Sequence, residues 1–273
     1  DHKTLFRGSG LELADLREYQ AHDDVRHIDW NVTARMQTPY VREHQEDREI
    51  SAWFLLDLSG SMDFGSKNQT KRQVMMNFVG VMAKLLMKRG NRLGALILNP
   101  AEPDGFKYIP PRMGRRHLLH VLHVLETSPN TQQVHQTDLN AWLARANGMI
   151  KRRSSVFVIS DFMGPSNWAT ELSALGRRHD TVAARLFDPA EMNLPNAGLM
   201  LLQDSETSEQ LLLDTANSKF RNQYMQLMAA RESELATCFA QAGVDALELS
   251  TDEDLANALM RFSELRKRRV WRA

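Results

Sequence analysis

The pattern of apolar and polar positions along the chain predicts a fold in which strands and helices alternate. Residues 50–56 and 156–160 are apolar without alternation, which is typical of strands buried on both faces of a sheet. Further strands are predicted at residues 92–98, 106–109, 181–187 and 245–249. Apolar residues at helical spacing predict helices at residues 66–89, 114–125, 138–149, 167–176 and 216–242. This alternation indicates an α/β fold with a doubly wound, mostly parallel sheet.

The first 48 residues depart from this pattern. They are polar and dense in charge, and they contain too few apolar residues to form a core of their own. We therefore expect residues 1–48 to be an appendage that packs on a main domain formed by residues 49–273. Within the appendage, the spacing predicts a short helix in residues 11–19 and a strand in residues 40–45. The expected anchors on the main domain are Tyr19, Val25, Ile28 and Trp30.

A second departure follows Asp188, where the alternation of strands and helices stops. Residues 199–203 and 210–213 are apolar and flank a polar segment, so they predict a β-hairpin inserted at about residues 198–214. The chain then returns to the main pattern with a final helix. That helix is expected to start after a variant capping box at residues 251–254 and to end near Leu265.

Composition and charge exclude several classes of protein. Of 273 residues, 42% are hydrophobic and 25% are charged, as is ordinary for a globular protein. Lys+Arg and Asp+Glu both number 34, so net charge gives no reason to expect nucleic acid or an anionic membrane as partner. The single cysteine, Cys238, rules out an internal disulfide framework and agrees with a cytoplasmic location. We expect no membrane span, because no apolar run approaches about 18 residues; a segment upstream of Asp1 stays open.

Candidate chemistry begins where the strand at residues 50–56 ends. Asp57 follows that strand, and Ser59 and Ser61 follow Asp57 at alternate positions. In an open α/β sheet, ligands bind at the carboxyl ends of the strands. Gly60 permits the tight turn that would bring the three side chains to one side. The alternative interpretation of this stretch is a helix N-terminus, capped by Asp or Ser.

Two later positions favour a metal site over a helix cap. The second buried strand also ends on an aspartate, Asp161, and Thr137 precedes a helix on a third loop. These side chains offer carboxylate and hydroxyl oxygens, with no Cys or His among them. Oxygen donors of this kind suit Mg²⁺ or another divalent cation such as Mn²⁺ or Ca²⁺. The predicted ligands are Asp57, Ser59, Ser61, Thr137 and Asp161.

Two resemblances to known proteins follow from these residues. The five predicted ligands resemble the metal-ion-dependent adhesion site of von Willebrand factor A domains, which implies a sheet of that type. The amino-terminal segment resembles the bacterial DUF58 family, whose signature precedes such a domain. The matching stretches are Gly10-Leu-Glu, Leu16-Arg-Glu-Tyr, Asp23-Asp24-x-Arg26-x-Ile28-Asp29-Trp30 and Ala34-Arg35. One position departs from the family, because His22 stands where members usually have Gly.

The resemblance implies a binding module rather than an enzyme. Von Willebrand A-type sites accept a carboxylate from a partner protein, and DUF58 proteins are associated with MoxR-type AAA+ ATPases. The implied role is a cytosolic adaptor or co-chaperone that acts with such an ATPase on a client protein, in protein maturation or metal-cofactor insertion, with no small-molecule substrate. A second candidate surface for partner binding is formed by Asp23, Asp24, Arg26 and Trp30. The alternative for these residues is a set of salt bridges and turns that hold the appendage.

Two other functions stay open at this stage. A Mg²⁺-dependent phosphoryl-transfer enzyme could use Asp57 as nucleophile, but such enzymes resemble Asp-x-Asp and place a second acid where this chain has Ser59. Nucleic-acid binding through the basic carboxyl-terminal tail, residues 261–272, is disfavoured by the neutral net charge.

Overall fold

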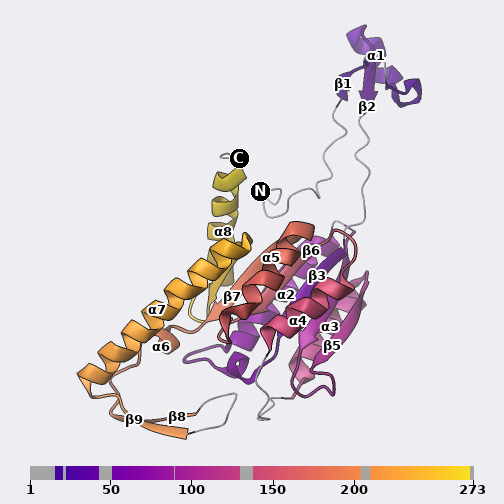
Figure 1. Cartoon of the computed structure of the whole chain (residues 1–273). Helices are drawn as coiled ribbons and strands as arrows, with labels where there is room; N and C mark the ends of the chain where they lie inside the picture. Colours follow the sequence, from indigo (N-terminus) through magenta and orange to yellow (C-terminus); the bar gives the residue numbers. More distant parts are fainter. Residues whose placement is uncertain are drawn as a thin grey trace. The chain divides into compact units, whose positions relative to one another are not determined.

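The structure is a computed structural model that describes residues 16–20, 23–42, 51–88, 90–129, 138–203 and 210–270. The chain divides into two compact units, and each is described here by itself. The larger unit contains Ile50–Ala273 and the smaller one Arg7–Glu49 (Figure 1).

A six-stranded sheet organises the larger unit, in the order β10-β7-β6-β3-β4-β5. Its strands are β3 (Ser51–Asp57), β4 (Arg92–Leu98), β5 (Phe106–Arg112), β6 (Ser155–Ser160), β7 (Asp180–Phe187) and β10 (Asp245–Ser250). All neighbouring pairs are parallel except β4 and β5, which are antiparallel. The predicted α/β class and mostly parallel sheet are therefore confirmed. The central strand β3 is buried from Ala52 onward, as its unbroken apolar run predicts.

One face of the sheet is covered by α2 (Lys71–Met87), α3 (Arg115–Thr127) and α8 (Leu255–Val270). Phe54 and Leu56 of β3 point into the core on this side. The opposite face is covered by α4 (Leu139–Met149), α5 (Ala169–Arg178) and α7 (Ser218–Ala242).

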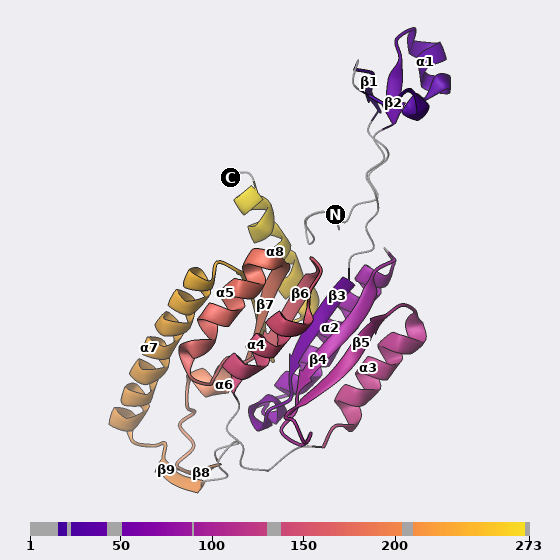
Figure 2. The ribbon, with the colours of Figure 1, turned by 45° about the vertical axis from the view of Figure 1, so that its right-hand side comes forward.

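The core on that second face receives the other residues of the same strand. Trp53 and Leu55 of β3 pack there with Trp142 of α4. Successive residues of β3 thus alternate between two cores, which is what a doubly wound sheet requires. Figure 2 shows helices on both faces of the sheet.

Three elements of the larger unit have bounds that differ clearly from the prediction. Helix α8 ends at Val270 and not near Leu265. Helix α2 begins at Lys71 and not at Ser66, because Thr70 and Gln73 form a capping box immediately before it. Strand β5 continues through Pro110 and Pro111 to Arg112. The two prolines are tolerated there because β5 is an edge strand and because its pairing with β4 shifts register between Ile109 and Arg112, which leaves Pro110 and Pro111 outside the ladder.

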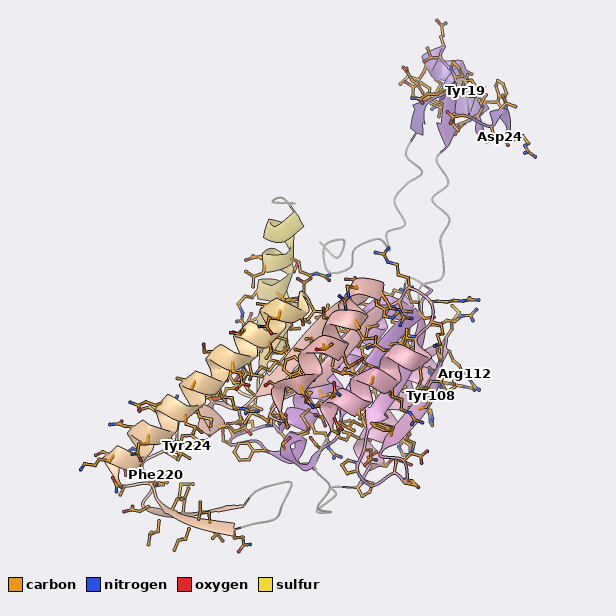
Figure 3. The ribbon with its side chains drawn as sticks, viewed as in Figure 1. Tyr19, Asp24, Tyr108, Arg112, Phe220 and Tyr224 are labelled. Atoms are coloured by element: carbon orange, nitrogen blue, oxygen red, sulfur yellow. The ribbon has the colours of Figure 1, made fainter. Side chains whose placement is uncertain are left out.

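The predicted hairpin insertion is confirmed as β8 (Leu199–Gln203) paired antiparallel with β9 (Gln210–Asp214). Its apolar side chains are mostly exposed, including Leu199, Leu201, Leu211 and Leu212. A short helix, α6 (Pro189–Met192), lies between β7 and the hairpin. Tyr224 of α7, labelled in Figure 3, donates to the Glu191 carbonyl at 2.7 Å and so ties α6 to α7.

The smaller unit has its own two-stranded sheet, β1 (Leu16–Glu18) antiparallel to β2 (Tyr40–Arg42). Between them lie a short 3-10 helix, η2 (Val25–His27), and α1 (Trp30–Met36). The helix predicted at residues 11–19 is wrong over its described part, because residues 16–18 form a strand. The strand predicted at residues 40–45 is confirmed over its described part.

The expected anchors of this unit differ in exposure. Val25 is 59% and Trp30 69% exposed, whereas Tyr19 and Ile28 are partly buried. The packing of the appendage on the main domain stays a prediction. Across both units, no helix among the described residues combines the length and the apolar character needed to cross a membrane.

Candidate functional site

Asp57 forms the floor of the candidate site, at the carboxyl end of the central strand. Its side chain is buried, with 1% of the residue exposed. Oδ1 accepts a hydrogen bond from the Ser59 amide at 2.8 Å, and Oδ2 accepts one from the Ser160 hydroxyl at 2.6 Å. Because Ser160 ends β6, this second bond joins the ends of two neighbouring strands.

The serine loop turns directly after Asp57. Ser59 precedes a short 3-10 helix, η3 (Gly60–Asp63), but its side chain does not cap that helix. Its Oγ lies 3.1 Å from the Oγ of Ser61 instead. Helix α2 is capped by Thr70, so neither serine serves as the cap that the alternative interpretation required.

Asp161 follows β6 and is also buried. Its Oδ1 accepts from the Met163 amide at 3.1 Å. The residue between them, Phe162, has a φ of 54°, in the left-handed region that residues with a Cβ rarely adopt. The Phe162 ring packs between Trp168 and Phe239, and its amide donates to Ser160 at 3.0 Å. The core therefore holds the turn that positions the Asp161 carboxylate.

A buried lysine, absent from the sequence prediction, completes the site. The Lys71 ammonium is fully buried and donates to Asp161 Oδ2 at 2.9 Å and to Glu191 Oε1 at 2.7 Å. A lysine in the first turn of a helix gives no sequence signal of burial. The Asp-Pro-x-Glu stretch at Asp188 to Glu191 did offer a signal, because it forms the capping box that presents Glu191 from α6.

Asp188 is a third carboxylate at a strand end, and it has a different role. It is fully buried and accepts from the Ser66 amide and hydroxyl at 2.8 and 2.7 Å. It also accepts from the Thr251 hydroxyl at 2.7 Å and the Ala190 amide at 2.8 Å. These bonds occupy both oxygens, and they outweigh burial and lower the pKa of Asp188. Asp188 thus fastens the loop before α2 to β7 and β10.

Asp57 and Asp161 carry more negative charge than their surroundings compensate. Burial, and then the charge of Asp161, raises the pKa of Asp57 to about 6, against the hydrogen bonds from Ser160 and Ser59. For Asp161, burial acts to raise the pKa. The charge of the Lys71 ammonium and hydrogen bonds from Lys71, Ser61 and Met163 outweigh burial, so the net pKa of Asp161 is lowered. The Lys71 ammonium thus pairs with Asp161 and Glu191, whereas no cation among the described residues acts on Asp57, and this negative charge suits a divalent cation.

The donor set therefore fits a hard cation in its chemistry. Four of the five predicted ligands, Asp57, Ser59, Ser61 and Asp161, lie at one edge of the sheet; Thr137 falls outside the described residues. No group of three or more His, Cys, Asp or Glu side chains suited to a metal occurs among residues that the structure describes. A metal site here would thus depend on two carboxylates supplemented by hydroxyls, and metal binding by these residues stays a prediction.

The second candidate surface is built of local turns. Asp23 accepts from the Gln20 amide at 2.8 Å. Asp24 caps η2 and forms an ion pair with Arg26 at 2.7 Å, while Asp29 caps α1. These contacts match the alternative prediction of salt bridges and turns. Partner binding by Asp23, Asp24, Arg26 and the exposed Trp30 stays a prediction.

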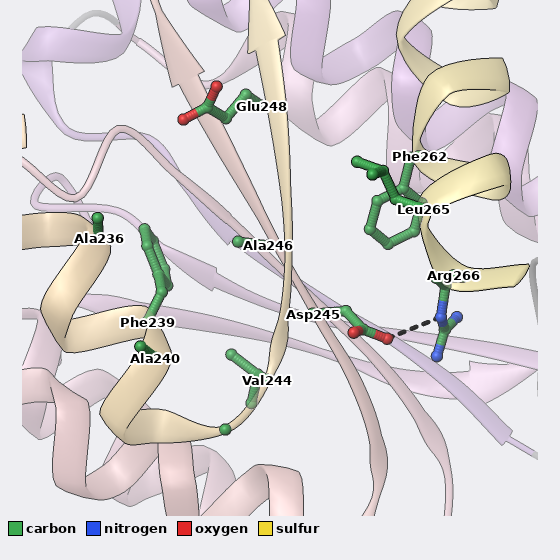
Figure 4. Close-up of a pocket in the computed structure, with 11 residues that line it drawn as sticks. Ala236, Phe239, Ala240, Val244, Asp245, Ala246, Glu248, Phe262, Leu265 and Arg266 are labelled. Atoms are coloured by element: carbon green, nitrogen blue, oxygen red, sulfur yellow. Dashed lines mark ion pairs between the residues drawn. The ribbon is translucent and has the colours of Figure 1, made fainter. Parts of the chain in front are cut away.

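A pocket of about 600 Å³ lies away from the candidate site, against β10 between α7 and α8 (Figure 4). Its lining is mostly apolar and includes Phe239, Val244, Phe262 and Leu265. None of the predicted metal ligands lines it.

Comparison with known proteins finds relatives of unknown function. The uncharacterized proteins Rv1480 of Mycobacterium tuberculosis and Mb1516 of Mycobacterium bovis are each 35% identical to this chain over 270 residues. The matches cover 98% of this chain and 83% of each relative.

Among solved structures, BatB from Bacteroides thetaiotaomicron is 13% identical with a TM-score of 0.48, over 80% of this chain and 98% of that protein. The von Willebrand A domain of SpRpn10 is 10% identical with a TM-score of 0.43, over 78% of this chain and 95% of that one. The mussel byssus protein PTMP1, solved with zinc in its MIDAS motif, is 13% identical with a TM-score of 0.38. The match covers 50% of this chain and 38% of that protein. These likenesses are distant.

A family model gives the decisive match. The family described as "Protein of unknown function DUF58" matches residues 15–234. The matched region includes β1 and β2 of the smaller unit, the serine loop, and the two strand ends that carry Asp57 and Asp161. It thus spans the candidate site and the signature segment from Leu16 onward, whereas Gly10-Leu-Glu lies before the matched residues. The chain belongs to the DUF58 family.

Proposed function

We propose that this protein is a metal-dependent protein-interaction module whose site lies at the carboxyl end of β3 and β6. The observation that supports it is the buried Asp57, whose pKa is raised to about 6 by burial and by the neighbouring Asp161 carboxylate. Two adjacent buried carboxylates are costly unless a cation compensates them.

Each residue has a defined task in this proposal. Asp57 and Asp161 supply the charged oxygens, and Ser59 and Ser61 supply neutral ones; Thr137 is the further proposed ligand. A bound divalent cation would supply the positive charge that attracts an incoming carboxylate. The Ser160 hydroxyl and the Ser59 amide hold the Asp57 carboxylate in place, so little reorganisation is needed on binding.

The same geometry supports a binding module over a phosphoryl-transfer enzyme. Both oxygens of Asp57 accept hydrogen bonds, which weakens the carboxylate as a nucleophile. Phosphoryl-transfer enzymes of the Asp-x-Asp type have a general acid two residues after the nucleophile. This chain has Ser59 at that position, and a serine hydroxyl cannot act as the general acid. We therefore propose that the chain has no phosphatase or ATPase activity of its own.

The partner class comes from the family resemblance. We propose that the incoming carboxylate belongs to a MoxR-type AAA+ ATPase, and that the two proteins act in the cytoplasm on a client in protein maturation or metal-cofactor insertion. ATP would be hydrolysed by the partner. Mg²⁺ is the proposed cation, with Mn²⁺ or Ca²⁺ as substitutes.

The test is a titration of the full chain with Mg²⁺ and Mn²⁺, followed by capture of the ATPase in Mg²⁺ and in EDTA. Asp57→Ala should abolish metal binding and partner binding together, because it removes a charged oxygen. Ser61→Ala should weaken the metal less, since water can replace one neutral oxygen. Asp104→Asn is the matched control, because Asp104 is an exposed acid on the loop after β4.

Two results would contradict the proposal. Equal capture of the ATPase in Mg²⁺ and in EDTA, retained in Asp57→Ala, would place the partner on another surface. Hydrolysis of a phosphoester by the wild-type chain, lost in Asp57→Asn but kept in Asp104→Asn, would establish the enzyme instead.

A further inference from the structure

The opposite edge of the sheet, where the parallel strands begin, carries a dense row of cations. The strand registers align the beginnings of β3, β4, β6 and β7 with the end of the antiparallel β5. Positively charged side chains gather on the loops at these strand ends, and all are exposed. We call this set the basic rim: Lys88, Arg92, Arg112, Arg115, Arg116, Lys151, Arg152, Arg153, Arg177 and Arg178.

Among the residues that the structure describes, few carboxylates pair with the basic rim. Arg92 has an interaction within the structure, and Arg178 donates to the carbonyls of Asn147 and Ile150 at 2.9 Å each. Within the described residues, the rim side chains other than Arg92 form no ion pair with a carboxylate. The described part of the larger unit thus has buried acids at the candidate site and exposed bases at the opposite edge of the sheet.

Two carboxylates that the structure describes near this edge are already paired. Asp180 and Asp245, which begin β7 and β10, form ion pairs with Arg266 at 2.8 and 2.7 Å. Figure 4 shows the pair of Asp245 and Arg266. Burial is the main cause that lowers the pKa of the neighbouring His179 to about 4, and the charges of Arg178 and Arg153 lower it further. Apart from Arg92, the rim is therefore a surface of positive charge that no carboxylate within the described residues pairs with.

The shape and chemistry of the basic rim favour a flat anionic surface. Five strands at a spacing of about 4.8 Å spread its charges over about 20 Å. None of the ten rim residues is aromatic, so the rim residues themselves offer no ring on which a base could stack, as single-stranded nucleic acid binding uses. It does have an apolar one: Met113, 51% exposed, between Arg112 and Arg115. Arginines around an exposed apolar side chain suit the headgroup region of a bilayer.

We propose that the basic rim docks the protein on an anionic lipid bilayer, with Met113 entering the headgroup region. The candidate metal site, at the other end of the strands, would then face away from the lipid. Binding should depend on salt, because the contacts are electrostatic and exposed. It should not depend on Mg²⁺, which separates this inference from the proposed function.

The test is flotation of the full chain with vesicles of phosphatidylcholine containing 30% phosphatidylserine, and with pure phosphatidylcholine. We expect binding only to the anionic vesicles, lost on raising NaCl from 0.1 to 0.5 M and unchanged by EDTA. Each cation near such a surface contributes about 1 kcal/mol, so Arg152→Gln/Arg153→Gln should weaken binding about tenfold or more. The control Lys107→Gln/Lys219→Gln removes the same charge elsewhere and should change binding less than threefold.

Three results would overturn the proposal. The first is no binding to anionic vesicles at 0.1 M NaCl. The second is an equal loss in the rim variant and the control variant. The third is tighter binding to a 20-base-pair duplex than to the vesicles, which would make the rim a nucleic-acid surface. Met113→Ser should weaken vesicle binding without affecting any binding to the duplex, because only a bilayer accepts the methionine side chain.

Discussion

The Nζ of Lys71 lies 2.9 Å from the Oδ2 of Asp161, and the lysine side chain is fully buried. The candidate metal site thus contains a cation supplied by the protein itself. Glu191 shares this ammonium at 2.7 Å from the short helix α6. A divalent cation bound by Asp57 and Asp161 would have to share Asp161 with Lys71, so the lysine should set both the apo stability and the metal affinity.

Lys71→Met separates these two effects. Removing the ammonium leaves Asp161 and Glu191 buried without a partner, so the free energy of unfolding in EDTA should fall by about 3–5 kcal/mol. The affinity for Mg²⁺ should rise at least tenfold, because the competing charge is gone. Calorimetric titration and thermal melts with and without Mg²⁺ measure the two quantities.

The control for that experiment is Lys84→Met, which neutralises an exposed lysine on the same helix. It should leave both quantities within experimental error of the wild type. A Lys71→Met protein that is destabilised but binds Mg²⁺ no more tightly would show that the lysine is only a structural partner of Asp161.

The raised pKa of Asp57 predicts a pH dependence of metal binding. A carboxyl group whose folded-state pKa is raised takes up a proton in the folded protein first, so Asp57 is neutral well below pH 6 and charged well above it. Affinity for Mg²⁺ should therefore be constant above about pH 7 and fall up to tenfold per unit below pH 6. Titrations at pH 5, 6 and 7.5 check this, and equal affinity at pH 5 and 7.5 would contradict it.

The free energy of unfolding of the apo protein should fall as the pH rises over this range, whereas the affinity for Mg²⁺ rises. For Asp57 the stabilising contribution is present below the unfolded pKa and is lost as the pH rises through about 6. Asp57→Asn should remove this contribution. Comparing wild type and Asp57→Asn in EDTA by denaturant unfolding at pH 5 and 7.5 isolates it from other titrating groups.

The sequence predicts the strand ends and the serine loop of this site, but not the buried lysine within it. The strands that end at Asp57 and Asp161 are identifiable because strands buried on both faces are apolar throughout. Ser59 and Ser61 follow from the spacing alone. Lys71 could not be found in this way, because its burial depends on Glu191, 120 residues away in the chain. Only the folded packing of α6 beside α2 makes a buried ammonium tolerable.

In the amino-terminal segment, the spacing of apolar residues predicted the wrong secondary structure. Residues 11–19 have spacing that predicts a helix, yet residues 16–18 pair with β2 as a strand. A three-residue strand is too short to show a period, so its pairing partner decides its conformation. The turn residues were more informative, because Asp24 and Asp29 cap the two short helices that follow them.

Ser160→Ala tests whether hydrogen bonds position the Asp57 carboxylate. The Ser160 hydroxyl donates to Asp57 at 2.6 Å and accepts from the Phe162 amide at 3.0 Å. Its loss should cost about 1–3 kcal/mol of stability, because a buried carboxylate oxygen and a buried amide lose their partner. The pKa of Asp57 should rise further, and Mg²⁺ binding at pH 6.5 should weaken more than at pH 8. An effect of equal size at both pH values would mean that the serine acts on geometry alone.

Asp188→Asn tests the assignment of the third strand-end carboxylate to structure and not to metal binding. The amide keeps the volume but loses acceptor capacity toward Ser66, Thr251 and Ala190, so the free energy of unfolding should fall by about 3 kcal/mol. The increase in melting temperature on adding Mg²⁺ should persist, because Asp57 and Asp161 are retained. Asp104→Asn, on an exposed loop, should change neither quantity. Loss of the Mg²⁺ response in a folded Asp188→Asn protein would show that Asp188 helps to bind the cation.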